Sequence, residues 1–169
     1  MLIPLTMVTA VNAHGPTRQK VKESVEINAP AATVWKAIGN FQSLNWHPAV
    51  EKTEGEGGNE PGAKRTITLK GGGQIFEELV KFDAEKMTMK YEITDVDVKV
   101  LPVKNYSSIM LVEDLGNGKS KFTWRGAFYR GYMNNNPPPE LNDEAAVKAV
   151  KGVYGAGLDA LKKKIEAAG

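Results

Sequence analysis

Hydrophobic residues in the last part of the chain recur every three or four positions, and charged residues lie between them. This spacing predicts one long amphipathic helix from Asp143 to Glu166. Asn142 is suited to cap its first turn, because its side chain can accept a hydrogen bond from a backbone N–H there. A helix with so long an apolar stripe must bury it against another element, and the rest of the chain offers a sheet.

Before this helix, apolar and polar residues mostly alternate, which is typical of half-buried strands. Seven such segments are joined by short links, so the sheet should be antiparallel. Their expected ranges are 20–28, 49–56, 64–70, 74–82, 87–94, 104–115 and 119–130. Pro30 favours a short helix over 31–39, and 41–48 is expected to form a second short helical turn or loop. The predicted class is therefore α+β.

Length and composition narrow the possibilities further. A chain of 169 residues is most simply one domain, and it can bury a core without a metal or a disulfide. It contains no cysteine, which excludes a thiol nucleophile and zinc–thiolate sites. The net charge is only +2, with both signs interspersed and no basic tract that would favour nucleic acid. No apolar run is long enough to span a membrane.

The first residues differ from the rest, because 2–13 are apolar and uncharged. Val11-Asn12-Ala13 places small residues where a signal peptidase would cleave, although Pro4 interrupts the run and no basic residue precedes it. The alternative is an N-terminal tail with no role in export. The expected organisation is a truncated signal segment at 1–13, a flexible tail at 14–19 and a single domain at 20–169.

Large aromatic residues on the strands and the first loop can either fill the core or line a cavity. They are Trp46, Tyr91, Tyr106, Trp124 and Phe128. Three glycines, Gly152, Gly155 and Gly157, lie within the predicted long helix, where each costs about 1 kcal/mol relative to alanine. Such glycines indicate either a close approach to the sheet or a void beneath the helix, and the sequence leaves both interpretations open.

His47 is the only histidine within the expected domain. It could be a general base or a metal ligand, but we favour a loop histidine hydrogen-bonded at the rim of a pocket. No metal site is predicted, because one histidine without cysteine is a poor ligand set. Glu77 and Glu78 are strand neighbours, so one of them points inward. Beside Arg65, an inward carboxylate would form an ion pair that either binds a polar ligand group or stabilises the end of the sheet.

Two features of the chain resemble a known family: the order of its predicted elements and a set of local residues that occur in a fixed order. The set begins with Ala29-Pro30, Val34-Trp35, Phe41 and Trp46-His47-Pro48. The chain resembles the START and Bet v 1-like (SRPBCC) superfamily in its polyketide cyclase/dehydratase-like branch, and it is most similar to MxaD-like proteins, periplasmic accessory proteins of methanol oxidation. The resemblance implies a helix-grip fold: a seven-stranded curved antiparallel sheet around the long C-terminal helix, with two short helices after the first strand.

The resemblance also implies a function. We expect non-catalytic binding of a hydrophobic or amphipathic small molecule between sheet and helix, without a cofactor. The expected location is the periplasm, with the cytoplasm as the alternative. The expected ligand-binding residues are Trp46, His47, Arg65, Glu77, Tyr91, Tyr106, Trp124 and Phe128. One alternative is docking on a periplasmic redox protein, a dehydrogenase or cytochrome, through 132–140. Another is a cyclase or dehydratase that uses His47 with Glu77.

Overall fold

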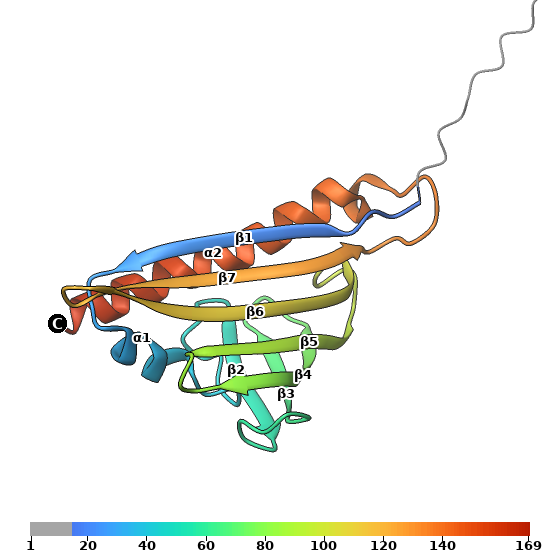
Figure 1. The fold of residues 1–169 in the computed structure, drawn as a ribbon. Helices are drawn as coiled ribbons and strands as arrows, with labels where there is room; N and C mark the ends of the chain where they lie inside the picture. Colours follow the sequence, from blue (N-terminus) through green and yellow to red (C-terminus); the bar gives the residue numbers. More distant parts are fainter. Residues whose placement is uncertain (1–14) are drawn as a thin grey trace, which may run out of the picture.

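The computed structural model describes residues 15–169, so the expected signal segment at 1–13 and His14 lie outside the described residues. Seven strands precede the long C-terminal helix (Figure 1). The strands are β1 (Gln19–Ile27), β2 (Val50–Glu56), β3 (Lys64–Leu69), β4 (Gln74–Asp83), β5 (Thr88–Val96), β6 (Val103–Gly116) and β7 (Lys119–Arg130). The helices are α1 (Ala31–Ile38), the 3₁₀ turn η1 (Pro139–Leu141) and α2 (Asp143–Ala167). Every strand predicted from the alternation is present, with its ends within one or two residues of the expected positions.

The strands form one antiparallel sheet in the order β1-β7-β6-β5-β4-β3-β2. In Figure 1, β1 and β7 run along α2, whereas β2 and β3 cross beneath it at the other edge of the sheet. Register shifts in the β2–β3, β4–β5 and β6–β7 pairs mark bulges, which increase local twist and bend a sheet. The bent sheet therefore grips α2, and the predicted helix-grip α+β fold is confirmed.

Of the two short helices that the resemblance implies after β1, only α1 forms, and 41–48 takes the turn-or-loop form that the sequence left open. Residues 41–48 make a series of turns. The backbone N–H of Phe41 donates to Asn59 Oδ1 at 2.8 Å, and that of Leu44 donates to Thr53 Oγ1 at 3.0 Å. These side chains satisfy two backbone donors from outside the segment, and its own hydrogen bonds close single turns, as from the His47 N–H to the Leu44 carbonyl at 2.9 Å.

The N-terminus of α2 has the predicted cap, in which Asn142 Oδ1 accepts a hydrogen bond from the backbone N–H of Ala145 at 2.8 Å. The helix buries one face in the core. Its buried residues are Ala146, Val150, Tyr154, Gly157, Leu158 and Leu161. The ring of Tyr154 stacks on Trp124 of β7, with 4.5 Å between the ring centroids. Within residues 15–169, none of the helices has the length and apolarity that a membrane crossing requires.

The three helix glycines have different surroundings. A Cβ atom added to Gly157 would lie 2.7 Å from His47 Cδ2 and 2.9 Å from Trp124 Cζ3. Nothing lies within 4 Å of a Cβ added to Gly152 or Gly155. Close approach to the strand aromatics therefore explains Gly157 but not Gly152 or Gly155.

Candidate functional site

A cavity of about 100 Å³ lies between the inner face of the sheet, the turns after α1 and α2. Its wall is mostly apolar, with a few polar groups, as in small-molecule sites generally. It is formed by Leu44, His47, Ala49, Val50, Ile67, Leu69, Ile75, Glu77, Tyr91, Ile93, Val100, Leu101, Tyr106, Trp124 and Val153. The exposed Ala49 and the half-buried Val100 and Val153 mark its mouth.

Five of the eight predicted site residues line this cavity, namely His47, Glu77, Tyr91, Tyr106 and Trp124. The other three lie behind its wall. Trp46 packs edge-on against Phe122, with 6.0 Å between the ring centroids. Phe128 stacks on Tyr106 at 6.0 Å, and Arg65 lies next to Glu77. Trp46, Arg65 and Phe128 can therefore support the wall but do not form its surface.

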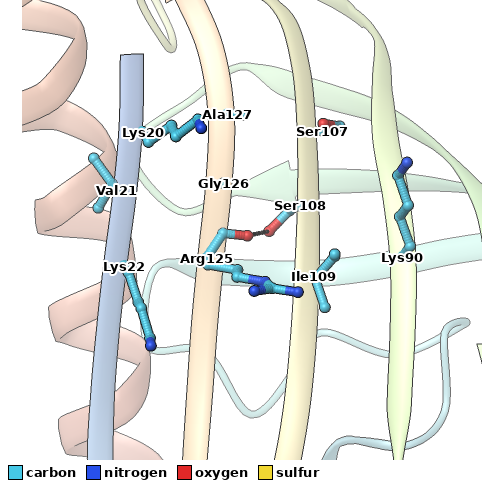
Figure 2. Close-up of a pocket in the computed structure, with 10 residues that line it drawn as sticks. All are labelled: Lys20, Val21, Lys22, Lys90, Ser107, Ser108, Ile109, Arg125, Gly126 and Ala127. Carbon is cyan, nitrogen blue, oxygen red and sulfur yellow. Dashed lines mark hydrogen bonds between the residues drawn. The ribbon is translucent and has the colours of Figure 1, made fainter.

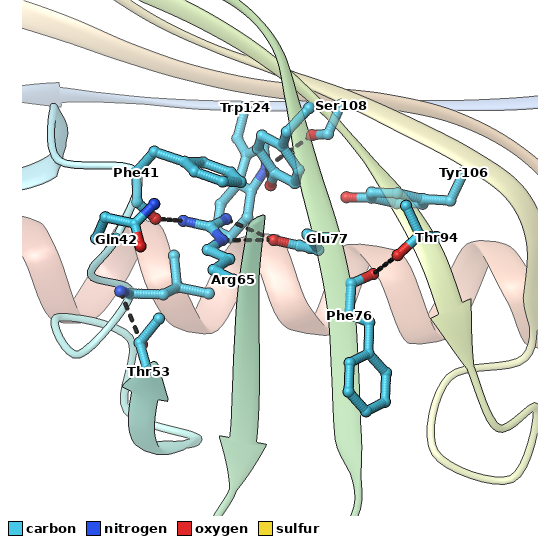
Figure 3. A network of polar contacts seen from close by, with 12 residues as sticks. Phe41, Gln42, Thr53, Arg65, Phe76, Glu77, Thr94, Tyr106, Ser108 and Trp124 are labelled. Atoms are coloured by element: carbon cyan, nitrogen blue, oxygen red, sulfur yellow. Dashed lines mark hydrogen bonds and ion pairs between the residues drawn. The ribbon is translucent and has the colours of Figure 1, made fainter. Parts of the chain in front are cut away.

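Arg65 and Glu77 form an ion pair in the interior, where they are only 2% and 6% exposed (Figure 3). Nε and Nη2 of Arg65 lie 2.7 Å and 2.6 Å from Glu77 Oε2, and Nη1 donates to the Phe41 carbonyl at 2.9 Å. The guanidinium also lies over the rings of Phe41 and Tyr91, 4.3 Å and 4.9 Å from their centroids. The prediction that one of the neighbours Glu77 and Glu78 points inward is confirmed, and the inward residue is Glu77.

Glu77 uses only one of its oxygens in this pair. Oε1 makes no hydrogen bond to any residue between 15 and 169. Burial raises the pKa of Glu77, and the neighbouring Arg65 charge opposes that shift. Two guanidinium nitrogens within 2.7 Å of Oε2 favour the carboxylate form against this burial, and Oε1 is then a hydrogen-bond acceptor at the cavity wall.

Four hydroxyl groups and an indole form a second polar cluster. Trp124 Nε1 donates to both Tyr91 Oη and Ser108 Oγ, each at 2.9 Å. Tyr154 Oη lies 3.1 Å from Ser108 Oγ and 2.5 Å from Tyr106 Oη. Burial raises the pKa of Tyr91, Tyr106 and Tyr154 above the ordinary tyrosine value, so these phenols stay protonated at neutral pH.

Sequence reasoning missed Ser108 and Tyr154 as members of this cluster. Ser108 lies two residues after Tyr106 on β6, so both face the same side of the strand. That alternation was a usable signal for Ser108. Tyr154 fell within the apolar stripe of α2, where an aromatic residue is more often core than functional.

His47 is buried and uses both ring nitrogens in backbone hydrogen bonds. Nδ1 accepts from the backbone N–H of Ala49 at 3.1 Å, so Nε2 carries the proton and donates to the Val153 carbonyl of α2 at 2.8 Å. Gly157 permits this contact by leaving room for the ring. The geometry agrees with the hydrogen-bonded loop histidine that we favoured. It does not pair His47 with Glu77, which the enzyme alternative requires.

The His47 contacts lead to a pH-dependent stability. Burial lowers the pKa of His47, although the hydrogen bond to Val153 opposes this shift. The unfolded chain then binds a proton below about pH 6.5 that the folded chain does not, so stability is lost as the pH falls through this range. We expect wild-type protein to lose free energy of unfolding between pH 7.5 and 5 more steeply than His47→Gln, by at most about 1.4 kcal/mol per pH unit. Urea denaturation at several pH values measures this difference. The same pH dependence of the free energy of unfolding in wild-type protein and His47→Gln would contradict the prediction.

A larger hollow of about 400 Å³ lies on the outer face of β1, β7, β6 and β5 (Figure 2). The cross-strand row Lys22, Arg125, Ile109 and Lys90 crosses it. Its basic side chains are exposed to solvent. The smaller cavity lies between the sheet and α2 and has the more apolar wall, so it is the better candidate for a small apolar ligand.

Solved structures support the fold assignment. The chain is similar to protein XoxI from Bacillus cereus, at 29% identity and a TM-score of 0.73, with 87% of this chain and 95% of that one covered. Norcoclaurine synthase from Thalictrum flavum is 19% identical, with a TM-score of 0.66 and coverage of 98% and 96%. Zhui aromatase/cyclase from Streptomyces sp. R1128 is 14% identical, with a TM-score of 0.68 and coverage of 89% and 94%. Below 25% identity, such similarity shows the fold alone.

No curated protein matches the chain in a sequence search. The likeness to MxaD-like proteins, the periplasmic location and the redox-protein partner therefore stay predictions. The superfamily resemblance is confirmed, because a family model described as polyketide cyclase/dehydrase and lipid transport matches residues 18–166. This chain belongs to the polyketide cyclase/dehydrase and lipid transport family.

Proposed function

We propose that the protein binds a small, mostly apolar molecule without transforming it, in the cavity between sheet and α2. The observation that carries this proposal is the mostly apolar cavity between sheet and α2, whose wall includes Glu77 of the buried ion pair. The family description, which includes lipid transport, is consistent with a hydrophobic ligand. The cavity volume of about 100 Å³ is below the roughly 150 Å³ of an engineered cavity that holds benzene, so the ligand is limited to about one ring at most.

The non-catalytic part of the proposal is supported by the state of the titratable groups. Both nitrogens of His47 are occupied by backbone groups, so the ring cannot take up a substrate proton without breaking a contact. The cavity tyrosines are held in their protonated form by burial. Glu77 is the remaining candidate base, and its contact with Arg65 stabilises the carboxylate against taking up a proton.

Filling the cavity provides the test. Ile93 lies opposite Glu77 on the neighbouring strand and lines the cavity. Replacing Ile93 with phenylalanine should weaken the binding of toluene by at least about tenfold, equivalent to about 1.4 kcal/mol, because the larger ring occupies the ligand's space. Binding would be measured by NMR titration.

Ile109→Phe supplies the matched control. This isoleucine lies on β6 and borders the outer hollow instead. The control substitution should leave toluene binding unchanged. Equal affinities for toluene in wild-type protein, Ile93→Phe and Ile109→Phe would overturn the proposal.

A further inference from the structure

The polar atoms on the cavity wall restrict the chemical class of its ligand. This inference rests on the proposed function. Glu77 is more than nine-tenths buried, and its Oε1 has no hydrogen-bond donor among residues 15–169. An apolar ligand that excludes water from the cavity would leave this charged oxygen without a donor, which is unfavourable. A ligand that donates a hydrogen bond to Oε1 would remove that cost.

The donor and acceptor roles of the hydroxyl groups in this cluster are fixed by one of its hydrogen bonds. Ser108 Oγ donates its single proton to the Arg125 carbonyl at 3.0 Å, which can only accept. Ser108 must therefore accept from Tyr154, and Tyr154 in turn must accept from Tyr106. The proton of Tyr106 is used inside the cluster, so its oxygen offers only lone pairs to the cavity.

Tyr91, unlike Tyr106, can offer its hydroxyl proton to a ligand. Its oxygen accepts from Trp124 Nε1 at 2.9 Å, and its own proton is not used in that bond, so it can be donated to a ligand. Glu77, Tyr91 and Tyr106 all line the cavity. Glu77 lies on β4 and Tyr106 on β6, with β5 between them, and the close-up in Figure 3 shows the Tyr106 hydroxyl directed toward the side where Arg65 and Glu77 meet. The wall thus presents two acceptors, Glu77 Oε1 and Tyr106 Oη, and one donor, Tyr91 Oη–H.

We propose that the cavity selects a small neutral hydroxyl compound, a one-ring phenol or alcohol, over hydrocarbons and carboxylates. A hydroxyl group can donate to Glu77 Oε1 or Tyr106 Oη and accept from Tyr91, while its apolar part contacts the isoleucine, leucine and valine side chains. A hydrocarbon leaves Oε1 without a donor. A carboxylate has no proton to donate and is repelled by the Glu77 charge, which Arg65 contacts from the side of Oε2.

Three one-ring probes test the selectivity by NMR titration of the whole chain at pH 7: phenol, toluene and benzoate. Phenol should bind at least about tenfold more tightly than either of the others. Equal binding of phenol and toluene inside the cavity would overturn the selectivity and leave the proposed function intact. If none of the three perturbs the cavity residues, the proposed function fails as well, so the two failures are distinguishable.

Two variants locate the selectivity. Glu77→Gln retains an acceptor for Arg65 and turns an NH₂ group toward the cavity, so the ratio of phenol to benzoate affinity should fall at least about tenfold. Tyr106→Phe leaves the ion pair intact, and it should weaken phenol binding about three- to tenfold without weakening toluene binding. Tyr129→Phe on the outward face of β7 is the control and should change neither affinity. An unchanged phenol preference in both Glu77→Gln and Tyr106→Phe would overturn the assignment.

Discussion

Replacing Arg65 with methionine should lower the free energy of unfolding by about 3–5 kcal/mol, because it leaves the Glu77 carboxylate buried without its partner. Arg65 is 2% exposed, and it also donates to the Phe41 carbonyl, which would lose this donor. Urea denaturation at pH 7 measures the change. Arg125→Met is the matched control, since Arg125 is exposed on the outer face of β7, and it should change stability by no more than about 0.5 kcal/mol.

The double variant Arg65→Met/Glu77→Leu shows whether the attraction within the ion pair exceeds, or only offsets, the cost of desolvating its two charges. Removing both charges should recover most of the loss, because two apolar groups of similar volume avoid the desolvation cost of the ions. An Arg65→Met variant that loses less than about 1 kcal/mol would contradict the assignment of Glu77 as an ionised, desolvated partner. The same result would remove the basis for an acceptor at the cavity wall.

Replacing Gly157 with alanine should destabilise the protein by up to about 2 kcal/mol, even though alanine is the better helix former. The new Cβ would lie 2.7 Å from His47 and 2.9 Å from Trp124. His47 is held at both nitrogens, and Trp124 is held by two hydrogen bonds, so neither ring can move without losing a contact. Overpacking of this kind costs about 1–3 kcal/mol, against roughly 1 kcal/mol gained in helix propensity.

Gly152 and Gly155 provide the control within the same helix. A Cβ at either position meets nothing within 4 Å, so each alanine substitution should stabilise the protein by about 0.5–1 kcal/mol. Thermal denaturation of the three single variants gives the comparison. Stabilisation by Gly157→Ala equal to that by Gly152→Ala would show that α2 does not approach the strand aromatics as closely as described.

The fold was predictable because its signals are local and periodic. Alternation along the strands and the three-to-four residue spacing of α2 each follow from one buried face. The segment 41–48 was not predictable in the same way. Its conformation depends on Asn59 and Thr53, which satisfy its backbone from elsewhere in the chain.

The candidate site was predictable only in part. Adjacent strand residues face opposite sides, so an inward carboxylate near Arg65 could be expected from Glu77 and Glu78 alone. The link between Ser108 on β6 and Tyr154 on α2 spans 46 positions and depends on where the helix docks. The size of the cavity likewise depends on packing and not on the pattern of residue types.

The most direct test of the ligand-binding account is to locate bound toluene by intermolecular NOEs in protein with ¹³C-labelled isoleucine methyl groups. Ile67, Ile75 and Ile93 line the cavity between sheet and α2, whereas Ile109 borders the outer hollow. The account predicts NOEs from toluene to the methyl groups of the first three residues and none to Ile109. NOEs to Ile109 alone, or no NOEs to any isoleucine at saturating toluene, would contradict it.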